Sequence, residues 1–168
     1  MENGIIINND DIEYLISCEK YITKKPYKFT TKQSDENRCV LRSTNGEYNF
    51  NVFISSSIRY PADFSVGLMY NDTYCLIRCN GFHGANREGF YDAPHHAYPH
   101  IHMLSVDDIN RHKERDPHYK YDATGEYYKL NDAILYFFKK CNIISYDKYF
   151  NPVELGQVKI FDNEGGAL

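Results

Sequence analysis

The sequence predicts a single α+β domain: an antiparallel sheet of about five strands, two hairpins plus a short His-x-His strand, with N-terminal and C-terminal helices packed on one face. Two observations predict it: apolar residues alternate along consecutive segments separated by turn residues, and helical periodicity occurs only before and after them. No Gly/Ser/Pro-rich linker divides the 168 residues. We therefore expect residues 1–168 to form one domain, with a core of about 10–143 and a peripheral C-terminal segment at 151–168, whose last dozen residues should fray.

An amphipathic pattern predicts the first helix over residues 10–24. Asn9 or Asp10 can cap its start, and Pro26 follows its end. Its apolar face consists of Ile12, Leu15, Ile16 and Ile22.

Alternating apolar residues predict four strands in two hairpins, followed by a fifth, shorter strand. The five segments are 39–43, 48–55, 64–70, 74–78 and 100–104. Asn45-Gly46 is a strong hairpin signal for the first pair, and Asn71-Asp72 supplies the turn of the second.

Two further helices are expected after the strands. Ser105-x-x-Asp108 resembles a capping box that opens a short helix through about Lys113. A final helix is expected over about 131–141, where apolar residues recur at helical spacing.

Composition and charge narrow the class of protein. A net charge of −4 argues against a chain that coats nucleic acid through a global positive field. Five cysteines without a close Cys-x-x-Cys pair favour reduced thiols and a cytoplasmic protein. We expect no membrane association, because the sequence shows no secretory leader and no apolar stretch near the roughly 20 residues that cross a bilayer.

One segment is basic although the net charge of the whole chain is negative. Between Lys20 and Arg42 there are seven Lys/Arg and only two acids. This pattern is typical of a solvated helix end and loop, and it also suits a surface that contacts phosphates. The candidate RNA-binding residues are Lys24, Lys25, Lys28, Lys32 and Arg87.

The histidines indicate where the functional site lies. All seven fall between His83 and His118, and four of them lie in the run Pro94 to His102. Histidine is the side chain that titrates nearest neutrality, so such a cluster is typical of proton transfer or metal binding. On a strand, His100 and His102 point to the same face with side chains roughly 7 Å apart.

Neighbouring residues could complete this site. Arg78, at the end of the adjacent strand, could bind a phosphate, and prolines on both sides should stiffen the histidine loop. The candidate catalytic residues are His100, His102, His95, His96, Tyr91, Asp92 and Arg78. A metal site would instead use His100 and His102 with a third ligand from the loop, drawn from His95, His96 and Asp92.

Two resemblances bear on function. The motifs Arg78-x-Asn80-Gly81 and Pro99-His100-Ile101-His102, with the flanking helices, resemble an uncharacterised family of small bacterial proteins from mobile elements. The run Tyr91-Asp-Ala-Pro-His-His96 followed by Pro-His-x-His is similar to the His-rich signature of TumE-type toxins of toxin–antitoxin pairs. These resemblances imply a phage, plasmid or defence-associated role on RNA, as a toxin or an anti-CRISPR-like inhibitor, with an antitoxin or host defence protein as a partner.

Three hypotheses follow for the function. The leading one is a metal-independent endoribonuclease without a cofactor, in which His100 and His102 are base and acid and Arg78 binds the phosphate. The second is a phosphodiesterase that uses one divalent transition metal ion. The third is a non-enzymatic protein that binds RNA, an RNA–protein complex or a protein partner. The sequence leaves the oligomeric state open.

Overall fold

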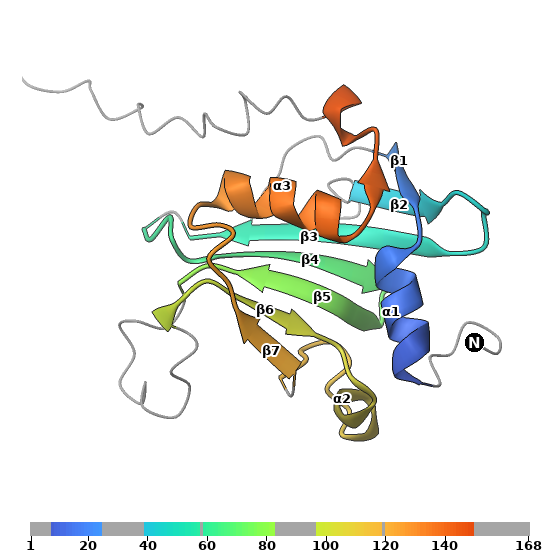
Figure 1. The fold of residues 1–168 in the computed structure, drawn as a ribbon, viewed down its shortest axis with the longest axis horizontal. Helices are drawn as coiled ribbons and strands as arrows, with labels where there is room; N and C mark the ends of the chain where they lie inside the picture. Colours follow the sequence, from blue (N-terminus) through green and yellow to red (C-terminus); the bar gives the residue numbers. More distant parts are fainter. Residues whose placement is uncertain (1–7, 25–38, 58, 83–96, 119, 150–168) are drawn as a thin grey trace, which may run out of the picture.

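An eight-stranded sheet forms the body of the protein in the computed structural model, which describes residues 8–24, 39–57, 59–82, 97–118 and 120–149. The strands lie in the order β7-β6-β5-β4-β3-β2-β1-β8, and α1 and α3 pack against the sheet (Figure 1). The strands are β1 (Lys20–Lys24), β2 (Cys39–Ser43), β3 (Asn49–Ser56), β4 (Phe64–Tyr70), β5 (Tyr74–Asn80), β6 (His100–Met103), β7 (Lys120–Ala123) and β8 (Ile143–Ile144). Neighbouring strands are antiparallel, except that β1 and β8 are parallel, so the α+β class is confirmed and the sheet is mixed.

The five strands predicted from the sequence, β2 to β6, form the contiguous centre of this sheet. Their turns have the expected backbone geometry. Gly46 has a φ of +77°, and Asn71 and Asp72 have φ values of 49° and 55°. Positive φ at both Asn71 and Asp72 identifies a type I′ turn, whose twist matches that of a hairpin, whereas in the first turn Gly46 has a positive φ and Asn45 does not.

The predicted number of strands was too small, because three strands at the sides of the sheet escaped the pattern analysis. Strand β7 is exposed at every residue and so has no apolar alternation. Strand β8 has only two residues. Strand β1 lies inside the basic stretch. Its residues Lys20 and Ile22 are buried, and the residue after each of them is exposed.

The first helix is shorter than predicted. Helix α1 (Asn9–Ser17) is capped by Asn8 rather than Asn9 or Asp10, and Asn8 and Asp11 form a reciprocal capping box. The chain leaves the helix at Cys18, which has a ψ of 144°, and residues 20–24 then pair with β2. Tertiary pairing therefore overrides the helical periodicity that had extended the prediction to residue 24.

The other two helices are confirmed. Helix α2 (Val106–Asn110) starts at the predicted capping box of Ser105 and Asp108 and ends three residues earlier than expected. Helix α3 (Leu130–Lys140) matches its prediction to within one residue at each end. None of the helices in the described part of the chain is long and apolar enough to cross a membrane.

The core lies between the sheet and the helices α1 and α3. Leu15 on α1 and Phe137 and Phe138 on α3 are completely buried. Along β6, Ile101 and Met103 point toward this helix side, and His100 and His102 point to the other. We call the sheet face that carries His100 and His102 the histidine face.

Candidate functional site

Five residues on adjacent strands form one row across the histidine face. The strand register pairs Phe53 with Gly67, Gly67 with Arg78, Arg78 with His102, and His102 with Tyr121. Directly paired residues of antiparallel strands project to the same side. The row therefore brings an aromatic ring, a cation, an imidazole and a second aromatic ring together from β3 to β7.

A second row beside it is held by hydrogen bonds. The hydroxyl of Ser65 donates to Asn80 Oδ1 at 2.6 Å, and Asn80 Nδ2 lies 3.2 Å from His100 Nε2. His100 Nδ1 lies 2.7 Å from the carbonyl oxygen of Tyr98, which only accepts, so Nδ1 carries the proton and Nε2 accepts from Asn80. Both ring nitrogens of His100 are thus engaged by the protein.

Tyr127 fixes the backbone of this second row. It is 1% exposed, and its hydroxyl donates a 2.9 Å hydrogen bond to the carbonyl oxygen of His100. Burial raises the pKa of Tyr127, so its hydroxyl keeps the proton that it donates.

The segment after α2 brings two more functional side chains to the first row. The backbone N–H of Cys75 donates to the carbonyl of Glu114 at 2.7 Å, which ties this segment to β5. The buried carboxylate of Asp108 accepts at 2.8 Å from the backbone N–H of His118. The same carboxyl group that caps α2 therefore places His118.

Arg78, Asp116 and His118 form a linked triad. Arg78 Nη1 lies 2.6 Å from Asp116 Oδ1, and His118 Nε2 lies 3.0 Å from Asp116 Oδ2. Burial alone would raise the pKa of Asp116, but the charge and hydrogen bond of Arg78, with those of His118, lower it below its ordinary value. Asp116 therefore stays ionised and accepts hydrogen bonds on both oxygens.

The rings of three histidines lie close together at this triad. The ring centroid of His102 is 5.0 Å from that of His100 and 6.0 Å from that of His118. Tyr121 adds a fourth ring 6.1 Å from His102. His102 is buried, whereas the side chain of His118 is 48% exposed, so the cluster extends from the protein interior to the surface.

The structure brings together three of the predicted site residues, Arg78, His100 and His102. The other predicted catalytic residues, Tyr91, Asp92, His95 and His96, lie outside the described residues. They remain predictions, as does the metal site that would combine one of His95, His96 and Asp92 with His100 and His102. In the described part of the chain, no group of three or more His, Cys, Asp or Glu residues is arranged to hold a metal ion.

The predicted RNA-binding lysines are mostly outside the described residues as well, namely Lys25, Lys28, Lys32, together with Arg87. Lys24 is exposed at the end of β1, and four strands separate β1 from β6. Lys20, counted in the same basic segment, is completely buried and therefore belongs to the core.

Sequence reasoning missed His118, Asp116 and Tyr121 as members of the site. The sequence signal that pointed to His118 was its position at the end of the segment that contains all seven histidines. His118 lies sixteen residues after His102, so the two form no short sequence motif. They come together because the segment after α2 folds back against β5.

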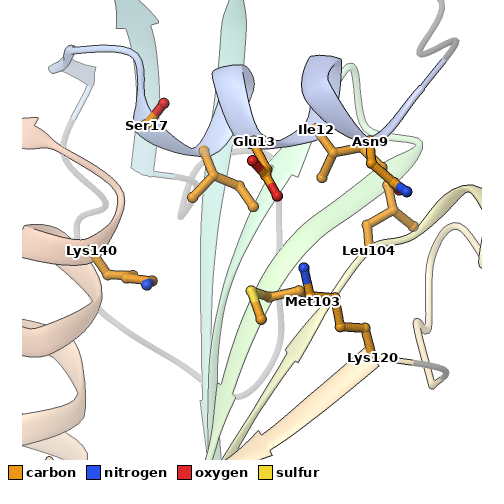
Figure 2. Close-up of a pocket in the computed structure, with 9 residues that line it drawn as sticks. Asn9, Ile12, Glu13, Ser17, Met103, Leu104, Lys120 and Lys140 are labelled. Atoms are coloured by element: carbon orange, nitrogen blue, oxygen red, sulfur yellow. The ribbon is translucent and has the colours of Figure 1, made fainter.

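A separate pocket of about 350 Å³ lies on the helix side of the sheet, between α1 and strands β6 and β7 (Figure 2). Ile12 and Leu104 form part of its apolar lining, and Glu13, Lys120 and Lys140 point toward its interior. Because Met103 lines this pocket and His102 faces the other way, the pocket and the histidine cluster are on opposite sides of β6.

Comparison with known proteins gives one match. The sequence model of DUF6978, a family of unknown function, matches residues 7–143, which run from just before α1 to the start of β8. No curated protein and no solved structure matches the chain. The resemblance to TumE-type toxins receives no support from these comparisons.

Proposed function

The chain belongs to DUF6978, a family of unknown function, and we propose that it cleaves RNA without a metal ion, using His102 and His118 as the proton-transfer pair. The observation that carries this proposal is the triad of Arg78, Asp116 and His118 beside the ring of His102. It places two imidazoles, a cation and an orienting carboxylate within one cluster.

RNA supplies its own nucleophile for this reaction. One imidazole takes the proton of the 2′-hydroxyl as the 2′-oxygen bonds to phosphorus, and the other protonates the 5′-oxygen as the P–O5′ bond breaks. The products are a 2′,3′-cyclic phosphate and a 5′-hydroxyl. His102 and His118 are suited to these steps because their ring centroids are 6.0 Å apart, so both imidazoles can reach the same phosphodiester group.

Asp116 acts as a positioning residue for His118. Its carboxylate accepts the N–H of His118 Nε2, which leaves Nδ1 for the substrate and fixes the ring orientation. Asp116 also fixes Arg78 through Nη1. A group that is held before the substrate arrives loses less entropy during the reaction.

Arg78 supports the proposal through the hydrogen-bonding capacity that it retains. Its buried Nε has no hydrogen-bond partner among the described residues. A guanidinium N–H next to two imidazoles can donate to a phosphoryl oxygen, on which negative charge increases in the transition state.

His100 serves this site as a positioning residue in our proposal. Because both its nitrogens bond within the second row, it packs against His102 and cannot exchange a proton without breaking those bonds. This differs from the expectation that His100 and His102 are base and acid. The geometry favours His118 as the partner of His102.

His102 is 0% exposed, so the proposal requires substrate binding to open access to its ring. One described neighbour placed to move outward is Tyr121, which lies on β7, the last strand of the sheet on that side.

The biological role is proposed on the sequence resemblances. We propose that the cleaved RNA belongs to a host cell or to an RNA–protein defence complex, that the chain acts in the cytoplasm as a toxin or anti-defence factor, and that an antitoxin or host defence protein is its partner.

The test is incubation of the purified chain with RNA, with and without a chelator, followed by analysis of the product ends. We expect chelator-resistant cleavage that yields 2′,3′-cyclic phosphates and decreases about 100-fold or more in His102→Ala and in His118→Ala. His112→Ala is the matched control, because His112 is in the same segment and outside the cluster. Chelator-sensitive cleavage would support a metal-dependent phosphodiesterase instead, and intact RNA would support a binding protein.

A further inference from the structure

We propose that the histidine face binds RNA as a single strand laid across the sheet strands, with one base on Phe53 and another on Tyr121. This inference rests on the proposed function, because the row from Phe53 to Tyr121 contains Arg78 and His102. It adds to that function a substrate class, single-stranded RNA, and two residues that bind bases.

Gly67 explains how Phe53 reaches toward the site. A Cβ at Gly67 would overlap the ring of Phe53, so this ring occupies the space above the glycine. Phe53 is on β3 and Arg78 is on β5, and only Gly67 on β4 lies between them in the row. The absence of a side chain at that position lets the aromatic ring extend over β4 toward the cation.

Tyr121 provides the second ring at the other end of the row. It is 46% exposed, and its ring centroid lies 6.1 Å from that of His102. Strands in a sheet are about 4.8 Å apart, so the four steps from β3 to β7 separate the two aromatic positions by about 19 Å. Arg78 and His102 lie between them, where the phosphate to be cleaved has to bind.

This order of side chains across the sheet is better suited to single-stranded RNA than to an RNA duplex. Bases in a single strand can leave their neighbours and stack on aromatic side chains, whereas those in an A-form helix are stacked on one another and inaccessible. Stacking accepts any base, because each has a π-face, so we expect little sequence preference. The side chains of Asp116 and His118 beside the middle of the row are about half exposed, whereas His102 is buried, so a bound strand has to open access to His102 as the proposed function requires.

The experiment measures binding separately from cleavage. A fluorescent oligouridylate with 2′-O-methyl groups has no 2′-hydroxyl nucleophile, so fluorescence anisotropy reports its binding alone. We expect the single strand to bind at least about tenfold more tightly than a 2′-O-methyl duplex of the same length. Tyr121→Leu and Phe53→Leu should each weaken binding by about five- to 150-fold, the range of one lost base–aromatic contact.

Matched variants separate stacking from folding. Tyr121→Phe and Phe53→Tyr keep the ring and should keep the affinity. Tyr14→Leu is the control for a lost exposed tyrosine, because Tyr14 is 45% exposed and lies on α1, on the helix side. If Phe53→Leu is unfolded by circular dichroism, the Tyr121 variants decide the question, since Tyr121 is an exposed residue of β7.

The outcomes distinguish this inference from the proposed function. Unchanged affinity in Tyr121→Leu and a folded Phe53→Leu, or equal binding of strand and duplex, would overturn the inference even if the chain cleaves RNA. The expected binding pattern without cleavage of ordinary RNA would support the single-strand site and reject the nuclease.

Discussion

Lys20 is the residue whose replacement tests our account of the fold most sharply. Its completely buried ammonium donates three hydrogen bonds, to the carbonyl oxygens of Ile16 at 2.8 Å, Cys18 at 2.7 Å and Cys141 at 3.1 Å. These acceptors lie at the C-terminal ends of α1 and α3, where carbonyls lack partners within the helix. The ammonium also lies 4.9 Å from the centroid of the Phe50 ring.

The substitution Lys20→Met introduces an unbranched apolar side chain that is one atom shorter and removes all three donors. A buried acceptor that loses its partner costs about 1–3 kcal/mol, which sets an upper range of about 3–9 kcal/mol for three. The variant also regains the cost of burying a charge. That cost is evident because burial lowers the pKa of Lys20, although nearby groups oppose the shift. Since single substitutions rarely exceed 4–5 kcal/mol, we expect a net loss of about 3–4 kcal/mol in the free energy of unfolding.

Urea denaturation followed by circular dichroism measures this loss. Lys24→Met on the same strand is the control, because Lys24 is exposed and should change stability by less than about 0.5 kcal/mol. The difference between wild type and Lys20→Met should grow as the pH rises toward 10.5, because there the unfolded lysine still holds a proton that the folded one has released. A Lys20→Met protein within 0.5 kcal/mol of wild type would refute the structural role that we assign to Lys20.

Two further predictions concern stability. Burial raises the pKa of both Cys75 and Cys79 to about 12. The unfolded chain therefore releases these protons near pH 9 while the folded chain keeps them. The free energy of unfolding should fall by up to about 1.4 kcal/mol per pH unit for each thiol above pH 9, which outweighs the opposite effect of the buried Lys20. A flat profile from pH 8 to 11 in calorimetric melting would contradict this. Gly81→Ala should destabilise the chain by about 1–3 kcal/mol, because its Cβ would overlap a main-chain carbonyl oxygen, whereas Gly125→Ala, whose Cβ has space, should be nearly neutral. Equal urea midpoints for these two variants would show that the close approach at Gly81 is not rigid.

The centre of the fold was predictable because local signals agree there. In β2 to β6, apolar alternation and turn residues indicate the same strands that the structure shows. The strands that were missed lack such agreement. Lys20 occupies an inward position of β1, and a buried lysine makes sense only once the ends of two helices are present to accept its hydrogen bonds.

The candidate site was predictable only in part, for a similar reason. Strand spacing correctly placed His100 and His102 on one face, and their strand next to that of Arg78. The contribution of Asp116 and His118 depends on the segment after α2 returning to β5, which the hydrogen bonds at Glu114 and Asp108 bring about. Long-range contacts of this kind leave no periodic signal in the sequence.

The pH–rate profile of single-turnover RNA cleavage tests the central claim most directly. If His102 and His118 transfer protons, wild type should show a bell-shaped profile in the presence of a chelator, with one imidazole active when neutral and the other when protonated. His118→Ala should retain only one limb of the bell, at a rate lower by about 100-fold or more. A bell of unchanged shape in His118→Ala would contradict the assignment of His118 to proton transfer.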